Sequence, residues 1–459
     1  MSYAATINSR MRGALASGSL TAKVMRSSGL TVLGFGFSQA LRLASNLLLT
    51  RLLFPEAFGL MALVIVFMVG LQMFSDFGIG PSVMRSERGD EPAFLDTVWT
   101  VQIIRGVALF VIGCLLAAPV AAFYGEPILF WMLIVASVQF LVLGLMPTRR
   151  ETANRHLTLG KLTLLEMVSQ VISLVVIVGL AFALQSVWAL VIGTLIGACI
   201  QVVIMSAFLP GHRNSLHWDK AAAHEVIHFG KWIFLSTIFG FLLAQGDKLI
   251  LGKFLALDVF GVYNIGFFLG SFPLMLGMVV ITRVLIPIYR SCPPLESREN
   301  FQKLRRMRVV ATAGLFAALS AVGFSGVWLV DLLYDDRYVH AGPIVTLIAC
   351  IQIPLVIGLT YDQAALAAGD SKRFFFVSAT KATLLVAGLL IGAQLGGLVG
   401  ALIGQGVATL AAYPALVWLS VRLGVWDPLH DLGFAVLGVI LAVSALWWNW
   451  AAIATLASV

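Results

Sequence analysis

Five charged side chains lie within stretches of this 459-residue sequence that are otherwise apolar, namely Arg42, Arg105, Asp247, Lys248 and Lys381. A charge at bilayer depth costs about 2.5 to 3.5 kcal/mol even on the scale obtained from insertion experiments, so such residues usually mark functional sites. The planar guanidinium group of arginine binds phosphate oxygens through paired hydrogen bonds. Cations on several predicted helices, without matching buried acids, therefore predict a cavity for an anion such as a phosphate.

Polar neighbours extend two of these positions. Gln39, Arg42 and Asn46 follow helical spacing and are expected to share one face of a helix. Gln102 precedes Arg105 by about one helical turn. We expect these side chains to line the same cavity as the cations. The alternative is that each arginine is hydrogen-bonded to carbonyl groups or paired with a carboxylate between helices.

Asp247 and Lys248 are adjacent opposite charges within one apolar stretch. Neighbouring residues on a helix project about 100° apart, so they need not pair, and one of them can face a cleft while the other reaches the membrane surface. Asp247, with Lys248, is therefore a candidate site for ion coupling through H⁺ or Na⁺. We expect no catalytic residue and no cofactor. We also expect no metal site, because the four cysteines show no ligand spacing.

The elements that must position these residues are membrane-spanning helices. With 60% hydrophobic and 11% charged residues and a mean hydropathy of +0.97, the chain is too apolar for a soluble protein. A span needs about 20 apolar residues. We predict thirteen spans, near residues 28–50, 58–80, 98–121, 127–146, 162–184, 187–209, 229–251, 259–285, 309–330, 342–361, 374–393, 398–420 and 432–450. A fourteenth, shortened helix after residue 449 stays open.

The distribution of basic residues predicts the orientation. If the N-terminus is cytoplasmic, the predicted external loops contain only Arg51, Lys253 and Arg337, as expected when positive charge stays inside. The net charge of +8 therefore indicates membrane topology and not a nucleic-acid partner. The basic leader, residues 1–27, is predicted to rest on anionic lipid headgroups.

An internal repeat relates the two halves of the sequence. Residues 51–59 and 253–261 have matching basic, acidic, Phe and Gly positions without a gap, which predicts two equivalent tight helix-to-helix corners. Residues 187–191 and 399–403 give a second match. Because each half has an even number of spans, the repeats are parallel. We predict a leader at 1–27, a six-helix lobe at 28–210, a cytoplasmic linker at 211–228, a second six-helix lobe at 229–422 and an extra helix at 431–459.

The sequence resembles the polysaccharide-type flippases, the Wzx-like branch of the multidrug, oligosaccharidyl-lipid and polysaccharide (MOP) exporter superfamily. The residues that carry the resemblance are 49–59, 76–78, 245–252 and 260–263. The resemblance implies an all-α fold of two six-helix bundles that moves a polyprenyl-diphosphate-linked oligosaccharide between leaflets of the bacterial inner membrane by alternating access. It also implies membrane lipids, a polysaccharide polymerase and a chain-length regulator as partners.

On this reading the diphosphate meets Arg42, assisted by Arg105 and Lys381. A cation-coupled multidrug exporter is the nearest alternative, but its pocket would require acids and aromatics. A membrane polymerase or ligase would need a sizeable external loop, whereas the longest predicted one, residues 331–341, has the pattern of a solvated turn. A scaffold without transport is a third alternative, and it gives no reason for deep arginines.

Overall fold

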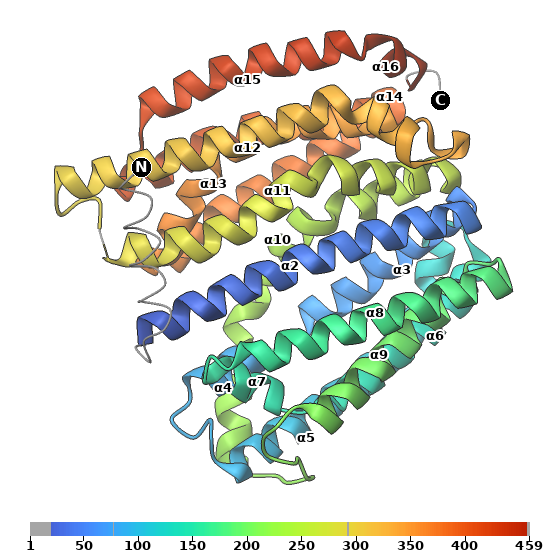
Figure 1. Cartoon of the computed structure of the whole chain (residues 1–459), viewed down its shortest axis with the longest axis vertical. Helices are drawn as coiled ribbons and strands as arrows, with labels where there is room; N and C mark the ends of the chain where they lie inside the picture. The colour runs from blue at the N-terminus through green and yellow to red at the C-terminus, as the bar shows by residue number, and fades with distance from the viewer. Residues whose placement is uncertain (1–19, 77, 292, 457–459) are drawn as a thin grey trace, which may run out of the picture. The chain divides into compact units, whose positions relative to one another are not determined.

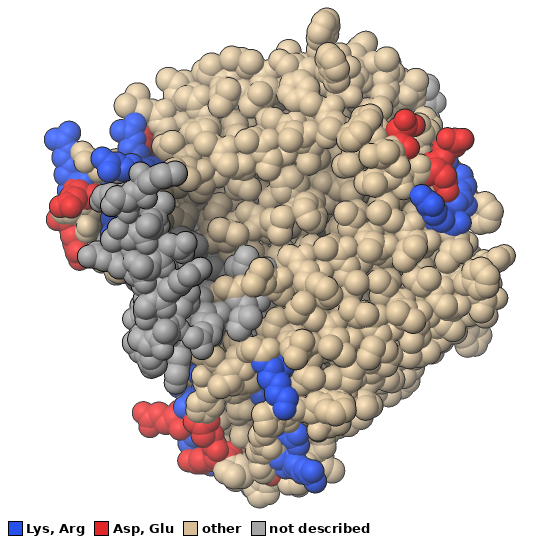
Figure 2. All heavy atoms as spheres, in the orientation of Figure 1, with Lys and Arg blue, Asp and Glu red and all other residues tan. Residues whose placement is uncertain are grey.

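The structure, a computed structural model, describes residues 20–76, 78–291 and 293–456, and all regular secondary structure assigned there is helical (Figure 1). Ten helical stretches of this part of the chain are long and apolar enough to cross a membrane. Each of the thirteen predicted spans overlaps a helix. On the face drawn in Figure 2, charged side chains gather near helix ends, and uncharged atoms cover the stretch between them. The all-α, multi-pass membrane fold is therefore confirmed.

The chain forms two compact units. Unit 1 contains residues 20–48 and 71–234, and unit 2 contains residues 49–70 and the chain from residue 235 onward. Residues 49–70 therefore group with the second half of the chain, although the sequence places them in the first lobe. The leader up to residue 19 lies outside the described residues, and helix α2 already begins at Leu20. The division into six plus six helices stays a prediction.

Unit 1 is built from apolar helices that pack through small residues. Gly106 of α5 lies against α6, since a Cβ atom on it would stand 2.6 Å from the carbonyl oxygen of Phe140. Gly193 of α9 packs in the same way on Ile177 of α8. Small residues allow close backbone approach, which favours helix association in membranes. The helices are α2 (Leu20–Leu52), α3 (Pro55–Phe74), α4 (Ile79–Arg85), α5 (Pro92–Tyr124), α6 (Pro127–Gly144), α7 (Arg149–Arg155), α8 (Leu159–Leu184) and α9 (Trp188–Phe208), and α2 and α3 extend into unit 2.

Unit 2 is arranged around α13, of which 72% of the apolar window is buried. Helix α14 contains two helices joined at Gly396 and Gly397, where the backbone is not helical, so spans 374–393 and 398–420 are separate as predicted. Helix α16 has seven residues and is too short for a fourteenth span. The helices are α10 (Lys220–Phe254, beginning in unit 1), α11 (Leu257–Ser291), α12 (Arg298–Leu333), η1 (Asp336–Tyr338), α13 (Ala341–Ala368), α14 (Ser371–Arg422), α15 (Pro428–Trp448) and α16 (Trp450–Leu456).

The two predicted corners are present, and within unit 2 they pack on each other. Each first helix ends with a basic residue in its last turn, and each second helix begins with an acid in its first turn. A Cβ atom on Gly59 would stand 2.2 Å from the carbonyl oxygen of Leu257, and one on Gly261 would stand 1.9 Å from that of Pro55. This reciprocal contact requires glycine at both positions. It explains why residues 49–70 belong to unit 2.

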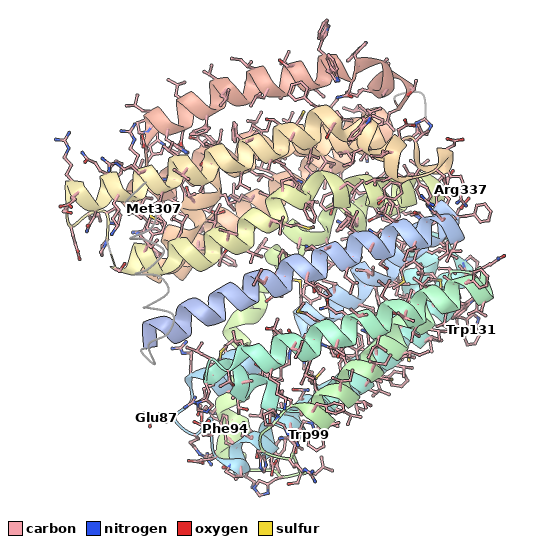
Figure 3. The ribbon with its side chains drawn as sticks, viewed as in Figure 1. Glu87, Phe94, Trp99, Trp131, Met307 and Arg337 are labelled. Carbon is pink, nitrogen blue, oxygen red and sulfur yellow. The ribbon has the colours of Figure 1, made fainter. Side chains whose placement is uncertain are left out.

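The 331–341 connection does more than form a solvated turn. Arg337 is held by Asp335, and its Nη2 donates to the Thr50 carbonyl oxygen at 2.9 Å. The Tyr338 hydroxyl donates to the Leu53 carbonyl oxygen at 3.2 Å. Carbonyl groups at a helix C-terminus lack intrahelical partners, so this loop caps α2. Arg337 lies just beyond the C-terminal end of α12, and Met307 lies nearer to the other end of this helix (Figure 3).

Candidate functional site

The predicted polar face of α2 divides between buried and exposed positions in unit 1. The Ser38 hydroxyl donates to Gln170 Oε1 of α8 at 2.5 Å, and Gln39 is buried. Arg42 is exposed and Asn46 is half-buried. The α2 face therefore serves partly for packing on α8. The exposure of Arg42 is compatible with the predicted anion contact, which stays a prediction.

Arg105 of α5 is held by neutral oxygen atoms. Its Nε and Nη2 donate to the Ser75 hydroxyl at 3.1 and 2.9 Å, and Nη2 also donates to the Gln72 carbonyl oxygen at 2.9 Å. Gln72 lies in the last turn of α3, where carbonyl groups lack helical partners. Asp76, the residue after Ser75, also interacts electrostatically with Arg105. The described hydrogen bonds of Arg105 therefore orient its guanidinium group through neutral oxygens, and an acid stands near it.

Gln102 has a different role from the predicted one. Its Nε2 lies 3.0, 3.3 and 3.1 Å from the carbonyl oxygens of Leu143, Gly144 and Met146. These carbonyls lie at and just beyond the C-terminus of α6. Gln102 therefore caps α6 with its amide nitrogen, and this correction removes it from the group expected to face a ligand. Its spacing from Arg105 did not reveal the neighbouring helix end.

Asp247 and Lys248 pair with each other, a contact that their spacing on the helix had left open. Lys248 Nζ lies 3.0 Å from Asp247 Oδ2 and 3.8 Å from the centroid of the Phe267 ring. The Tyr263 hydroxyl also donates to Asp247 Oδ2, at 2.6 Å. Asp247 is 4% exposed, so both its lysine and its tyrosine partner are needed to offset the cost of burying the carboxylate. Ion coupling at this pair stays a prediction.

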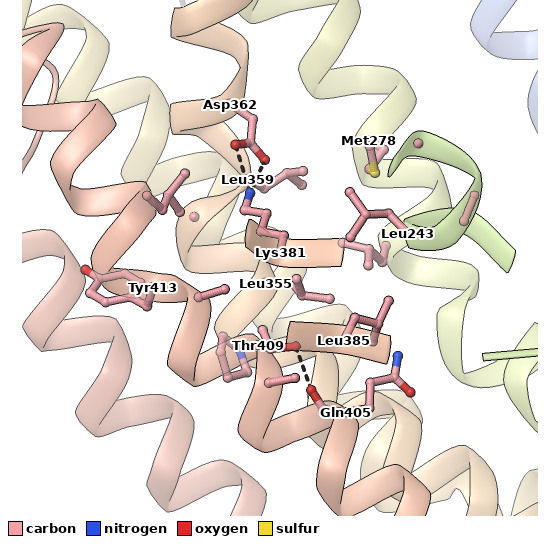
Figure 4. A pocket seen from close by; sticks show the side chains of 18 residues that line it. Leu243, Met278, Leu355, Leu359, Asp362, Lys381, Leu385, Gln405, Thr409 and Tyr413 are labelled. Atoms are coloured by element: carbon pink, nitrogen blue, oxygen red, sulfur yellow. Dashed lines mark hydrogen bonds and ion pairs between the residues drawn. The ribbon is translucent and has the colours of Figure 1, made fainter. Parts of the chain in front are cut away.

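Lys381 also has a matching acid, which corrects the expectation that the cations lack one. Its Nζ lies 2.9 and 2.8 Å from the two carboxylate oxygens of Asp362 on α13 (Figure 4). Both residues line a cavity of about 480 Å³ within unit 2. Sequence reasoning missed Asp362 because it follows the predicted end of a span by one residue. The signal that could have found Asp362 is its position, since it directly follows an apolar span and can continue the same helix.

The rest of this cavity is apolar apart from a few polar groups. Leu243, Met278 and Leu385 are among its apolar lining residues (Figure 4). Gln405 Oε1 is buried and has no hydrogen-bond partner among the described residues. The Tyr413 hydroxyl donates to Asp431 on α15. A cavity with apolar walls, one ion pair and a free amide oxygen suits an amphipathic ligand that combines charge with hydrogen-bond donors.

Comparison with known proteins shows the family of this chain. A family model described as polysaccharide biosynthesis protein matches residues 48–343. The chain belongs to this family. It is 21% identical over 308 residues to the teichuronic acid biosynthesis protein TuaB of Bacillus subtilis, covering 66% of this chain and 63% of TuaB. It is 22% identical over 384 residues to the lipopolysaccharide biosynthesis protein WzxC of Escherichia coli, covering 82% of this chain and 77% of WzxC. The family resemblance noted in the sequence is confirmed.

Solved structures show the same fold. The lipid II flippase MurJ in an inward closed conformation is similar with a TM-score of 0.65 and 12% identity, over 93% of this chain and 97% of that one. An inward-facing multidrug resistance MATE family transporter of the MOP superfamily is similar with a TM-score of 0.62 and 13% identity, over 84% and 94%. The predicted fold of this superfamily is therefore confirmed for the polysaccharide biosynthesis protein described here.

Proposed function

We propose that this protein is a flippase that carries a polyprenyl-diphosphate-linked oligosaccharide across the bacterial inner membrane for surface polysaccharide synthesis. It is multi-pass with a cytoplasmic N-terminus and works by alternating access. Family membership and the fold shared with a lipid flippase support this proposal. The observation that carries it is Arg105, a cation that lies in an apolar helix and whose described hydrogen bonds go to neutral oxygens.

The barrier to flipping such a lipid comes from its charged head. Moving the diphosphate and its sugars through hydrocarbon without partners would cost many kcal/mol, because each unsatisfied polar group is expensive there. Arg105 offers a charge-assisted, oriented donor group for phosphate oxygens. Arg42, exposed on α2, and Lys381, in the unit 2 cavity, supply further cations. The sugars need hydrogen-bonding side chains such as Gln405, while the tail stays in lipid.

A reconstituted system tests the proposal. The purified full-length protein is placed in liposomes that contain a polyprenyl diphosphate carrying a fluorescent oligosaccharide, and transfer between leaflets is followed with an impermeant quencher. The wild type is expected to equilibrate the lipid, and Arg105→Gln is expected to slow it at least tenfold. The control Arg373→Gln, which removes an exposed charge paired with Asp370 at the start of α14, should leave transfer unchanged. Failure of the wild type to move the lipid would contradict the proposal.

The similarity to a multidrug resistance transporter favours one second candidate. A drug exporter of this fold would move lipophilic cations. The same liposomes loaded with a fluorescent lipophilic cation separate the two, since we expect no protein-dependent cation transport. Dissipating a proton or sodium gradient in the lipid assay would show whether H⁺ or Na⁺ is the coupling ion. We expect the protein to release the lipid-linked glycan chemically unaltered. A polymerase and a chain-length regulator would use it afterwards.

A further inference from the structure

The ion pair between Lys381 and Asp362 is placed within reach of a ligand. Both residues line the unit 2 cavity, and their side chains are 20% and 24% exposed. The pair is therefore neither sealed in the protein interior nor fully solvated. In such surroundings each charge needs a partner, because an uncompensated buried charge costs several kcal/mol. The partner need not be the same in every state of the protein.

Asp362 and a phosphate group would compete for the same ammonium group. Lys381 Nζ already makes two short contacts with the carboxylate oxygens. A phosphate oxygen is an equally good acceptor for an ammonium donor. The carboxylate of Asp362 also repels an incoming anion at this short distance. Binding of the anion must therefore displace or neutralise this carboxylate.

Few other titratable groups face the pair. Among the described residues that line the cavity, α10 and α11 contribute only apolar groups and glycine, and the remaining titratable side chain is Tyr413 of α14. Its hydroxyl hydrogen is directed to Asp431, so it is not a counter-ion of Lys381. The acceptor Gln405 Oε1 is unpaired among the described residues and is suited to a hydroxyl group of a sugar. These features point to a bound amphipathic anion.

The geometry points to Asp362 as an internal substitute for the phosphate of the substrate. In the empty protein its carboxylate neutralises Lys381, and the headgroup replaces it during transport. Lys381 is then compensated in both the empty and the loaded states, so neither state leaves a bare charge in the membrane. The inference rests on the proposed function for the identity of the anion.

A soluble prenyl diphosphate such as farnesyl diphosphate is the probe. Its affinity for the purified full-length protein is measured by calorimetry for the wild type, Asp362→Asn, Lys381→Met and Lys381→Arg. We expect Asp362→Asn to bind at least fivefold tighter, Lys381→Met at least tenfold weaker, and Lys381→Arg close to the wild type.

Folding is checked separately with the double variant Asp362→Asn/Lys381→Met, which removes both charges and should unfold thermally near the wild type. If Asp362→Asn binds no tighter than the wild type while Lys381→Met binds more weakly, the proposed replacement of Asp362 by the phosphate is overturned. Lys381 then stands only as an anion-binding residue. Unchanged binding by Lys381→Met would overturn the whole proposal, because Lys381 would then not bind the anion. The flippase proposal is judged independently, by lipid transfer in the wild type and in Arg105→Gln, neither of which alters this cavity.

Discussion

Arg105 in unit 1 and Lys381 in unit 2 are both cations within apolar helices, yet the two units hold them differently. Arg105 donates to a serine hydroxyl and a backbone carbonyl, whereas Lys381 contacts both oxygens of a carboxylate. Neutral partners fix the direction of a charge and leave it in place, while an acid cancels it. On the account proposed above, Arg105 of unit 1 keeps a positive charge for an anion, and the charge of Lys381 in unit 2 becomes available when its acid is displaced.

The same contrast extends to other polar groups in the spans. In unit 1 the amide of Gln102 bonds to backbone carbonyls, and Ser38 bonds to Gln170. In unit 2 Lys248 bonds to the carboxylate of Asp247. Among these groups, the one in unit 2 has an acidic partner and those in unit 1 have neutral partners, although acids also pair with cations in unit 1, as Glu166 does with Arg150. Altering the partners of each cation shows whether this contrast matters for function or only for stability.

The largest effect is expected at the more deeply buried of the two pairs, Asp247–Lys248. Asp247→Asn leaves the ammonium group of Lys248 without its counter-ion. The Lys248 side chain is only 15% exposed, so water cannot fully replace this partner. Removing one partner of a buried pair costs about 3 to 5 kcal/mol, and we expect roughly 2 to 4 kcal/mol here. Thermal unfolding in detergent measures this loss. The control Tyr263→Phe removes one hydrogen bond and should cost about 1 kcal/mol. Equal stability of Asp247→Asn and the wild type would contradict a structural role for the pair.

The next variant gives Arg105 of unit 1 an acidic partner, as Lys381 has in unit 2. Ser75→Asp places a carboxylate beside Arg105, where the serine hydroxyl now accepts its hydrogen bonds. The new acid should neutralise Arg105 and lower lipid transfer about tenfold, which corresponds to about 1.4 kcal/mol. Ser75→Asn, which adds similar volume without charge, is the matched control. If both variants flip lipid equally well, the charge of Arg105 is not what unit 1 contributes.

A smaller effect concerns the strength of the Lys381 pair itself. A double-mutant cycle with Lys381→Met and Asp362→Asn should give a coupling free energy of about 1 kcal/mol in thermal unfolding. The value is modest because both side chains remain partly exposed. Coupling as large as that expected for a sealed pair would mean that Asp362 cannot be exchanged for a ligand. That result would remove the difference between this pair and Asp247–Lys248.

The smallest effect is expected in the loop that caps α2. The hydrogen bond from the Arg337 side chain lowers the pKa of Asp335 below its ordinary value of 3.8. Such a carboxylate stabilises the folded state above pH 3.8, and this contribution disappears as the pH falls through the folded pKa. Since Asp335 is 37% exposed, Asp335→Asn should cost only a few tenths of a kcal/mol at pH 7. Acid unfolding curves of the two proteins should converge below pH 3.8, and a constant difference would contradict this account.

The sequence predicted the helices well and their contacts poorly. The corners at residues 51–59 and 253–261 were predictable because charge and glycine positions are local signals, and the structure has both. Asp362 was missed, and the sequence did not settle whether Asp247 pairs with Lys248. Periodicity indicates which residues share a helix face, but the partner of a charge depends on which helices become neighbours. Gln102 illustrates this limit, since its partners lie on α6 and in the residues that follow it, more than 40 positions away.

The central claim is that a cation within the spans carries the phosphorylated head of a lipid across the membrane. The most direct measurement is transfer of a fluorescent polyprenyl-diphosphate oligosaccharide in liposomes containing the wild type, Arg105→Gln or Arg105→Lys. We predict rapid transfer by the wild type, at least tenfold slower transfer by Arg105→Gln, and an intermediate rate for Arg105→Lys, which keeps the charge but loses the paired donors. Equal rates for the wild type and Arg105→Gln would contradict the account.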